Sequence, residues 1–192
     1  MKKKILVIGG NSDIVFHTIS NFLNIAEEII FLSKNLDDLS LKINKLEKIN
    51  KNIRFKKFYF DILNLNESLK ILSEYNNFNI VIFSVGYLEN PEHNIDKLID
   101  VNYKNILILS EWIIQNCKEI EDIIYFTSIA ADRGKSKNNI YSSAKSGLSN
   151  YLEGLTQRVS KKKINILEIK PGYVNTKMTR DIKLPKLLTS SP

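Results

Sequence analysis

The fold of this chain is constrained most by a regular alternation of short apolar runs with longer segments of helical period. The apolar runs predict buried strands at residues 3–9, 28–33, 53–60, 79–86, 122–128 and 164–172. Between them, apolar residues at helical spacing predict helices at residues 12–24, 36–49, 65–75, 95–117 and 138–160, the fourth interrupted near its start. Strands that alternate with helices form a parallel sheet covered on both faces. We therefore expect an α/β domain of three layers with a doubly wound parallel sheet, whose ligands bind beyond the carboxyl ends of the strands.

Composition narrows the class of protein. The 192 residues, 43% of them hydrophobic, suffice for one domain with its own core, residues 1–192. No apolar run is long enough to predict a transmembrane segment, and the single cysteine, Cys117, indicates a reducing compartment, which we expect to be the cytoplasm. The net charge of +7 could attract nucleic acid, anionic lipid or a phosphorylated ligand. Without an arginine cluster or interleaved aromatic residues, we favour solvated lysines and expect neither a nucleic-acid partner nor, given only two distant histidines, a metal site.

The stretch VIGGNSDIV, residues 7–15, joins the first predicted strand to the first predicted helix. Gly9 would permit a tight turn, and Gly10 would leave room for a ligand. Asn11 or Ser12 could cap the helix or donate to a phosphate, because a helix N-terminus carries unpaired N–H groups and attracts anions. A capped strand-to-helix turn without a ligand is the alternative, and this stretch alone does not decide between them.

The end of the second predicted strand carries Ser33, Lys34 and Asn35, where the adenosine ribose of a dinucleotide would lie. An NAD site usually has an acidic residue here. A small polar residue followed by a cation suits the 2′-phosphate of NADP instead. A lone lysine in solvent is the alternative interpretation.

A third group of residues could move a proton. Tyr141 and Lys145 are four residues apart and share one helix face. An ammonium near a phenol favours the phenolate, so we expect Lys145 to lower the pKa of Tyr141. Ser128, at a strand end 13 positions before Tyr141, could hydrogen-bond the same substrate oxygen. A surface Tyr–Lys pair is the alternative.

Taken in order, these motifs resemble the short-chain dehydrogenase/reductase family, which has a Rossmann fold, from Lys4 to about Thr179. The motifs that carry the resemblance are GGNSDIV, DIL at 61–63, SVG at 84–86, VNY at 101–103, the set Ser128, Tyr141 and Lys145, and PGYVNT at 171–176.

The resemblance implies roles for these residues. Tyr141 would be the general acid or base, Lys145 would lower its pKa and hold the nicotinamide ribose, and Ser128 would stabilise the substrate oxygen. Asn102 would position a water that links Lys145 to solvent, and Thr176 would bind the nicotinamide carboxamide. The other cofactor contacts would come from Gly9, Asn11, Ser12, Asp13, Ile14, Ser33, Lys34, Asn35, Asp61, Ile62, Ser84, Val85, Gly86, Pro171, Gly172 and Val174. The resemblance also implies a homodimer or homotetramer.

The chain departs from the family pattern at Asp13 and Val15, which replace two glycines, and at Ser84, which replaces an asparagine. Since a carboxylate would repel a pyrophosphate, we expect that of Asp13 to turn toward helix N–H groups or solvent. Family members usually continue with another helix and a final strand, so we expect the last strand to be missing and the chain to be a fragment.

These observations favour an enzyme that uses NADP(H) in preference to NAD(H) to reduce a ketone to an alcohol. A narrower similarity, in residues 128–155 and 171–179, is to reductases of lipid-linked 2-keto pentoses, the decaprenylphosphoryl-2-keto-ribose reductase type. A non-catalytic dinucleotide-sensing protein is the alternative, because the glycine pattern is incomplete.

Overall fold

The computed structural model describes residues 2–88, 94–134, 136–177, 179 and 189–191. Six strands form one parallel sheet in the order β3-β2-β1-β4-β5-β6. The strands are β1 (Lys3–Ile8), β2 (Ala26–Ser33), β3 (Arg54–Tyr59), β4 (Ile80–Phe83), β5 (Asp122–Phe126) and β6 (Asn165–Ile169). This order is that of a doubly wound sheet, so the predicted fold class is confirmed.

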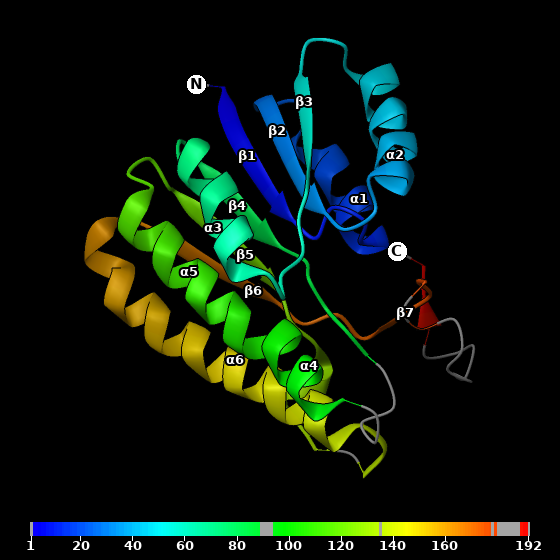
Figure 1. Cartoon of the computed structure of the whole chain (residues 1–192), viewed down its shortest axis with the longest axis vertical. Helices are drawn as coiled ribbons and strands as arrows, with labels where there is room; N and C mark the ends of the chain where they lie inside the picture. Colours follow the sequence, from blue (N-terminus) through cyan, green and yellow to red (C-terminus); the bar gives the residue numbers. More distant parts are fainter. Residues whose placement is uncertain (1, 89–93, 135, 178, 180–188, 192) are drawn as a thin grey trace.

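Helices cover both faces of the sheet, which gives the expected three layers (Figure 1). On one face lie α1 (Asp13–Ile19) and α2 (Leu36–Ile49). On the other lie α3 (Leu65–Glu74), α4 (Ile95–Ile99), α5 (Asn105–Asn116) and α6 (Asn139–Val159). Each layer of helices encloses its own buried apolar cluster, because successive residues of each strand point to opposite faces: Ile5 and Val7 belong to the α1–α2 side, and Leu6 and Ile8 to the other.

One helix differs from the prediction, and the interruption of another is confirmed. The first ends at Ile19 and continues as a 3-10 turn, Ser20–Phe22, so it is shorter than the expected 12–24. The fourth is interrupted, as predicted, by a π-helical turn over Asp100–Lys104. Inside that turn the Asn102 amide donates to the Leu98 carbonyl at 2.9 Å, which competes with the backbone ladder of the helix.

The carboxyl ends of β1 and β4 meet at the point where the strand order reverses. Gly9 leaves β1 with a φ of +96°, and a Cβ at this position would lie 2.8 Å from the backbone of Ser84. The Ser84 N–H donates to the Ile8 carbonyl at 2.8 Å, and its hydroxyl donates to the Gly9 carbonyl at 3.0 Å. Only glycine combines this backbone conformation with so close an approach, and a crevice opens at this point of such folds.

A second, two-stranded sheet lies beyond β6. It pairs β7 (Tyr173–Val174) with β8 (Thr189–Ser190) in parallel. Figure 1 shows this segment beside the end of the sheet from which α1 begins. The chain after β6 therefore returns toward the turn between β1 and α1 that contains Gly9 and Gly10, called the glycine turn below.

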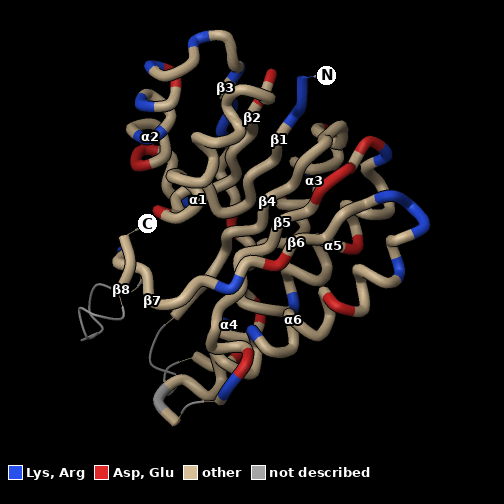
Figure 2. The backbone as a smooth tube through the Cα atoms, turned by 180° about the vertical axis from the view of Figure 1, so that it is seen from behind, with Lys and Arg blue, Asp and Glu red and all other residues tan. Residues whose placement is uncertain are grey.

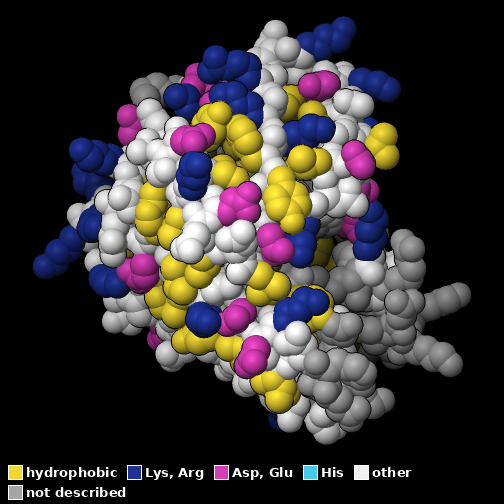
Figure 3. Space-filling view, in the orientation of Figure 1, with side chains coloured by type: hydrophobic (Ala, Val, Ile, Leu, Met, Phe, Trp, Pro, Cys, Tyr) yellow, Lys and Arg dark blue, Asp and Glu magenta, His cyan; other side chains and the backbone are white. Residues whose placement is uncertain are grey.

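Over the part of the chain that the structure describes, lysines and arginines do not gather in one place. Figure 2 shows lysines and arginines spread over α2, the strand starts and the helix ends, with acidic residues among them, and Figure 3 shows the same mixture on one face. This supports the interpretation of the net charge as solvated lysines. Among the described residues, no helix has the length and apolar character needed to cross a bilayer.

The close approach at Gly9 generates a stability prediction. We expect Gly9→Ala to lower the free energy of unfolding by roughly 1–3 kcal/mol, because alanine is strained at this φ and its Cβ meets backbone. Gly154→Ala, in α6 where a Cβ meets nothing within 4 Å, is the matched control and should raise stability by up to about 1 kcal/mol. Urea denaturation of both variants measures the difference; equal stabilities would contradict the assigned strain.

Candidate active site

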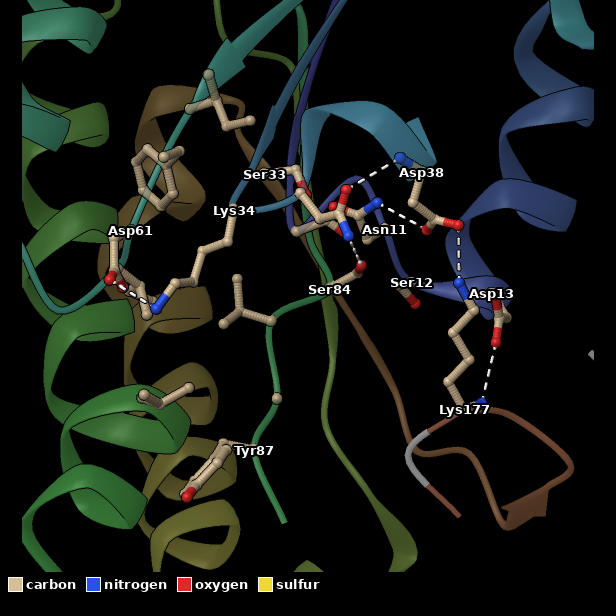
Figure 4. Close-up of a pocket in the computed structure, with 18 of the residues that line it drawn as sticks. Asn11, Ser12, Asp13, Ser33, Lys34, Asp38, Asp61, Ser84, Tyr87 and Lys177 are labelled. Atoms are coloured by element: carbon tan, nitrogen blue, oxygen red, sulfur yellow. Dashed lines mark hydrogen bonds and ion pairs between the residues drawn. The ribbon is translucent and has the colours of Figure 1, made fainter. Parts of the chain in front are cut away.

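A cavity of about 560 Å³ lies at the carboxyl ends of β1, β2 and β4. Its volume is within the range of small-molecule sites. The predicted cofactor-binding residues in its lining are Gly9, Asn11, Ser12, Asp13, Ile14, Ser33, Lys34, Asn35, Asp61, Ile62, Ser84, Val85, Gly86 and Thr176. The structure thus brings together predicted residues from five separate parts of the sequence in one cleft (Figure 4).

The glycine turn is built differently at its two glycines. The side of Gly10 on which a Cβ would lie faces the core, where it would meet Phe31 at 3.0 Å and Leu39 at 3.3 Å. The expectation that Gly10 leaves room for a ligand is therefore wrong: it leaves room for Phe31. The Ser12 hydroxyl caps α1 by accepting the Val15 N–H at 3.3 Å, as one of the alternatives predicted.

Asn11 makes the turn suitable for a polar ligand. Its amide N–H donates to Asp38 at 2.8 Å, but its Oδ1 is buried and has no hydrogen-bond partner. A buried oxygen without a partner is unfavourable, and a ligand that donates a hydrogen bond would relieve this cost. Together with the size of the cleft, this oxygen fits a nucleotide cofactor.

The carboxylate of Asp13 is held by two groups that the sequence did not suggest. Lys42 Nζ lies 3.0 Å from Oδ1, and the Lys177 N–H donates to Oδ2 at 3.1 Å. Burial acts to raise the pKa of Asp13, but these hydrogen bonds and the charge of Lys42 outweigh it and keep the pKa below its usual value. Of the two expected surroundings, helix N–H groups or solvent, the first is wrong: the carboxylate meets a lysine of α2 and a distant backbone amide, and the side chain is 22% exposed.

Lys34 forms an ion pair with Asp61, with 2.7 Å between Nζ and Oδ2. Burial tends to raise the pKa of Asp61, while the hydrogen bonds from Lys34 and the Leu63 N–H lower it below its ordinary value. The Lys34 side chain remains 61% exposed, so it can turn toward a ligand. Two predicted residues from different strand ends therefore meet at one end of the cleft.

Two asparagines hold two of the loops that line the cleft, the loop after β4 and the loop after β3. Asn102 accepts the Tyr87 N–H at 3.0 Å and donates to the Tyr87 carbonyl at 2.7 Å. Asn105, one turn later, donates to the Ile62 carbonyl at 2.9 Å. Both amide hydrogens of Asn102 are donated to backbone, to Tyr87 and Leu98, so its side chain fixes the loop after β4. Its role in holding a water stays a prediction.

The three residues expected to move a proton are grouped beside the cleft. The Ser128 hydroxyl lies near enough to the Tyr141 phenol to influence its pKa, and Lys145 Nζ lies 5.9 Å from the centroid of the Tyr141 ring. Lys145 is 1% exposed and donates to the Val85 carbonyl, in the cleft wall, at 3.4 Å. The Ile129 N–H donates to the Pro171 carbonyl at 3.1 Å, which joins the Ser128 loop to residues 171–174, including Gly172 and Val174.

The pKa of Tyr141 does not follow the expectation. Burial raises it above the ordinary value for tyrosine, and the nearby Ser128 hydroxyl only reduces the increase. The expected lowering by Lys145 is therefore wrong for this structure, where the ammonium lies near the ring. Burial also lowers the pKa of Lys145, to about 8.

Sequence reasoning missed the polar residues that support the cleft, namely Asp38, Lys42, Tyr87, Lys97, Asn105 and Lys177. The only available signal was position: Lys177 follows Thr176, and Asp38 and Lys42 follow the second strand at helical spacing. Among the residues that the structure describes, no three His, Cys, Asp or Glu side chains gather as metal ligands would.

Comparison with known proteins agrees with this geometry. A family model described as short chain dehydrogenase matches residues 3–186. The 3-oxoacyl-[acyl-carrier-protein] reductase FabG of Buchnera aphidicola is 29% identical over 206 aligned residues, which cover 99% of this chain and 82% of that protein. The human 3-oxoacyl-[acyl-carrier-protein] reductase is 36% identical over 70 residues; the match covers 36% of this chain and 30% of the human protein.

Solved structures support the fold independently. A short chain dehydrogenase from Burkholderia cenocepacia, in complex with NADP, superimposes with a TM-score of 0.80 at 18% sequence identity. The superposition covers 98% of this chain and 79% of that one. At this level of identity the likeness establishes the fold alone.

The burial of Lys145 generates a pH prediction. Its folded-state pKa of about 8 is below the ordinary 10.5, so the unfolded state binds the proton more tightly and charged Lys145 destabilises the fold at neutral pH. This cost declines as the pH rises from about 8 to 10.5. Lys145→Met should therefore stabilise the protein relative to wild type most at pH 7, by at most about 3 kcal/mol, and less at high pH.

Thermal unfolding of wild type and variant across this pH range measures the difference. The packing change is the same at every pH, so only the ionisation makes the difference vary. Lys45→Met, on the exposed face of α2, is the matched control. A stability difference for Lys145→Met that stays constant with pH would contradict the assignment.

Proposed function

Because the chain belongs to the short-chain dehydrogenase/reductase family, we propose that it is an NADPH-dependent oxidoreductase that reduces a ketone to a secondary alcohol. The observation that carries this proposal is the grouping of Ser128, Tyr141 and Lys145 beside the cleft, where the Lys145 ammonium donates to the Val85 carbonyl in the cleft wall. A dinucleotide-sensing protein without catalysis would have no need of this group.

A dinucleotide held by the residues of the cleft would supply the hydride for the carbonyl carbon. Tyr141 gives its hydroxyl proton to the carbonyl oxygen, and Ser128 donates a hydrogen bond to the same oxygen. The raised pKa of Tyr141 keeps it protonated and ready to act as an acid in the free protein. Lys145 supplies positive charge close to the phenol, which stabilises the phenolate that remains after proton transfer.

Lys34 supports NADPH over NADH. A 2′-phosphate near the end of β2 would compete with Asp61 for the Lys34 ammonium, and phosphate is the more highly charged acceptor. Asp61 would then be free to accept a hydrogen bond from the adenine.

Two classes of ketone are proposed as substrates. The relatives described above reduce 3-oxoacyl groups on acyl carrier protein, according to their names, which favours a 3-oxoacyl thioester. The similarity of residues 128–155 and 171–179 to reductases of lipid-linked keto-pentoses favours a keto-sugar.

Helices α5 and α6, joined by the hydrogen bond from Tyr151 to Glu111, would form the contact in a homodimer or homotetramer.

Tyr141→Phe tests the proton-transfer role. The variant should bind NADPH as wild type does but lose turnover of a ketone by about two orders of magnitude or more, because no acid remains to protonate the alkoxide. Tyr59→Phe, at a tyrosine that is 47% exposed on β3, is the matched control and should keep full activity. The activity of both variants is measured in turnover assays with an acetoacetyl thioester and with a keto-sugar. Retained turnover in Tyr141→Phe would contradict the proposed mechanism.

Lys34→Met tests the cofactor preference. We expect it to weaken NADPH binding by about five- to tenfold and to leave NADH binding nearly unchanged, because only NADPH carries the 2′-phosphate. Fluorescence titration with each cofactor gives the two dissociation constants, with Lys45→Met as the control for the lost charge. Equal affinity of the wild type for both cofactors would remove the basis of this preference.

A further inference from the structure

Three segments that are far apart in the sequence are tied together at the mouth of the cleft. They are the glycine turn, the first turns of α2 and the loop after β6, which contribute Asn11 and Asp13, Asp38 and Lys42, and Lys177. Asp38 accepts the Asn11 amide at 2.8 Å and the Lys177 ammonium at 2.8 Å through its two oxygens. Figure 4 shows Lys177 bridging Asp38 and Asp13 across the opening.

The two lysines of this network have different surroundings. The Lys42 side chain is only 12% exposed, and its ammonium also donates to the Asn11 carbonyl at 2.6 Å. It therefore holds the turn against α2 as a fixed part of the structure. The Lys177 side chain is 57% exposed, and an ion pair this exposed is weak enough to break and re-form. Of the two lysines, Lys177 is therefore the one whose contacts in this network can break without disturbing the rest of the fold.

Lys177 lies at the end of a loop that lines the cleft, so its contacts with Asp13 and Asp38 also fix the position of this loop. It follows Thr176, which also lines the cleft, and its backbone N–H and its ammonium reach Asp13 and Asp38. The contacts of Lys177 with Asp13 and Asp38 therefore hold the loop, residues 171–177, across the opening. Movement of such a loop away from the cleft would widen the route by which a ligand leaves.

We propose that Lys177 is a latch: its ion pair with Asp38 fixes the 171–177 loop over the glycine turn and slows the release of the bound dinucleotide. This inference rests on the proposed function, since it assumes that the cleft holds a dinucleotide. Lys177 is a positioning residue in this role, because it acts through the loop and not on the reacting atoms.

A purely electrostatic effect of these charges on dinucleotide binding can be told apart from a latch. The two explanations agree for the loss of Lys177 but predict opposite effects for the loss of the Asp38 charge. Loss of Lys177 would make the site more negative and weaken phosphate binding, whereas loss of the Asp38 charge would make it more positive and strengthen binding. A latch depends on both partners, so removing either one has the same effect. The sign of the two effects separates the explanations.

The experiment is a double-mutant cycle with Lys177→Met, Asp38→Asn and the double variant, in which NADPH release is followed by stopped-flow fluorescence. Each single variant should release NADPH roughly three- to tenfold faster than wild type, and the double variant should be no faster than either. Lys177→Arg should restore slow release, and Lys45→Met, which removes the same charge from an exposed site, should leave it unchanged.

Amide hydrogen exchange in the free protein gives a second readout. Residues 172–177 should exchange faster in Lys177→Met and in Asp38→Asn than in wild type or Lys45→Met. Opposite effects of the two single substitutions on NADPH release, or unchanged release in both, would overturn the latch while leaving the proposed function intact. Failure of the wild type to bind any dinucleotide would instead overturn the proposed function.

Discussion

The whole site depends on the close approach of two strand ends, at Gly9 and Ser84. The chain leaves β1 through a positive φ, and the place where a side chain would begin is 2.8 Å from the Ser84 backbone. Because the hydroxyl of Ser84 also donates to the Gly9 carbonyl, the carboxyl ends of β1 and β4 are joined where the strand order reverses. The turn into α1 and the loop after β4 then diverge from this point and form the two walls of the cleft.

The acidic residue in the glycine turn changes how the turn is supported. Asp13 would repel a pyrophosphate if it were free, but here it is compensated by Lys42 and by the Lys177 N–H. Val15 occupies the other altered position and is fully buried in the core on the α1–α2 side, so it contributes packing. The lost glycines are thus replaced by charge pairing at one position and by apolar burial at the other.

Much of the fold could be predicted from the sequence, because strand and helix periodicities are local. The helix over Leu36–Ile49 and the interruption before Asn105 were both predictable in this way. The strand order was not, since it depends on contacts between distant segments. The approximate membership of the cleft followed from strand ends, but the partners did not: that Lys34 meets Asp61, or that Lys177 meets Asp38, depends on the folded geometry. Burial likewise reversed the expected pKa shift of Tyr141, because the sequence does not give the depth of a side chain.

The proposed function requires that this cleft hold a reduced nicotinamide cofactor whose hydride goes to a ketone while Tyr141 supplies the proton. The most direct measurement is isotope transfer. The protein would be incubated with NADPH carrying deuterium at either face of the nicotinamide C4, together with an acetoacetyl thioester or a keto-sugar, and the alcohol analysed by mass spectrometry. We predict that a single deuterium reaches the carbinol carbon of the product from one of the two labelled cofactors and not from the other. Absence of deuterium from the product with both cofactors and both ketones would contradict the claim.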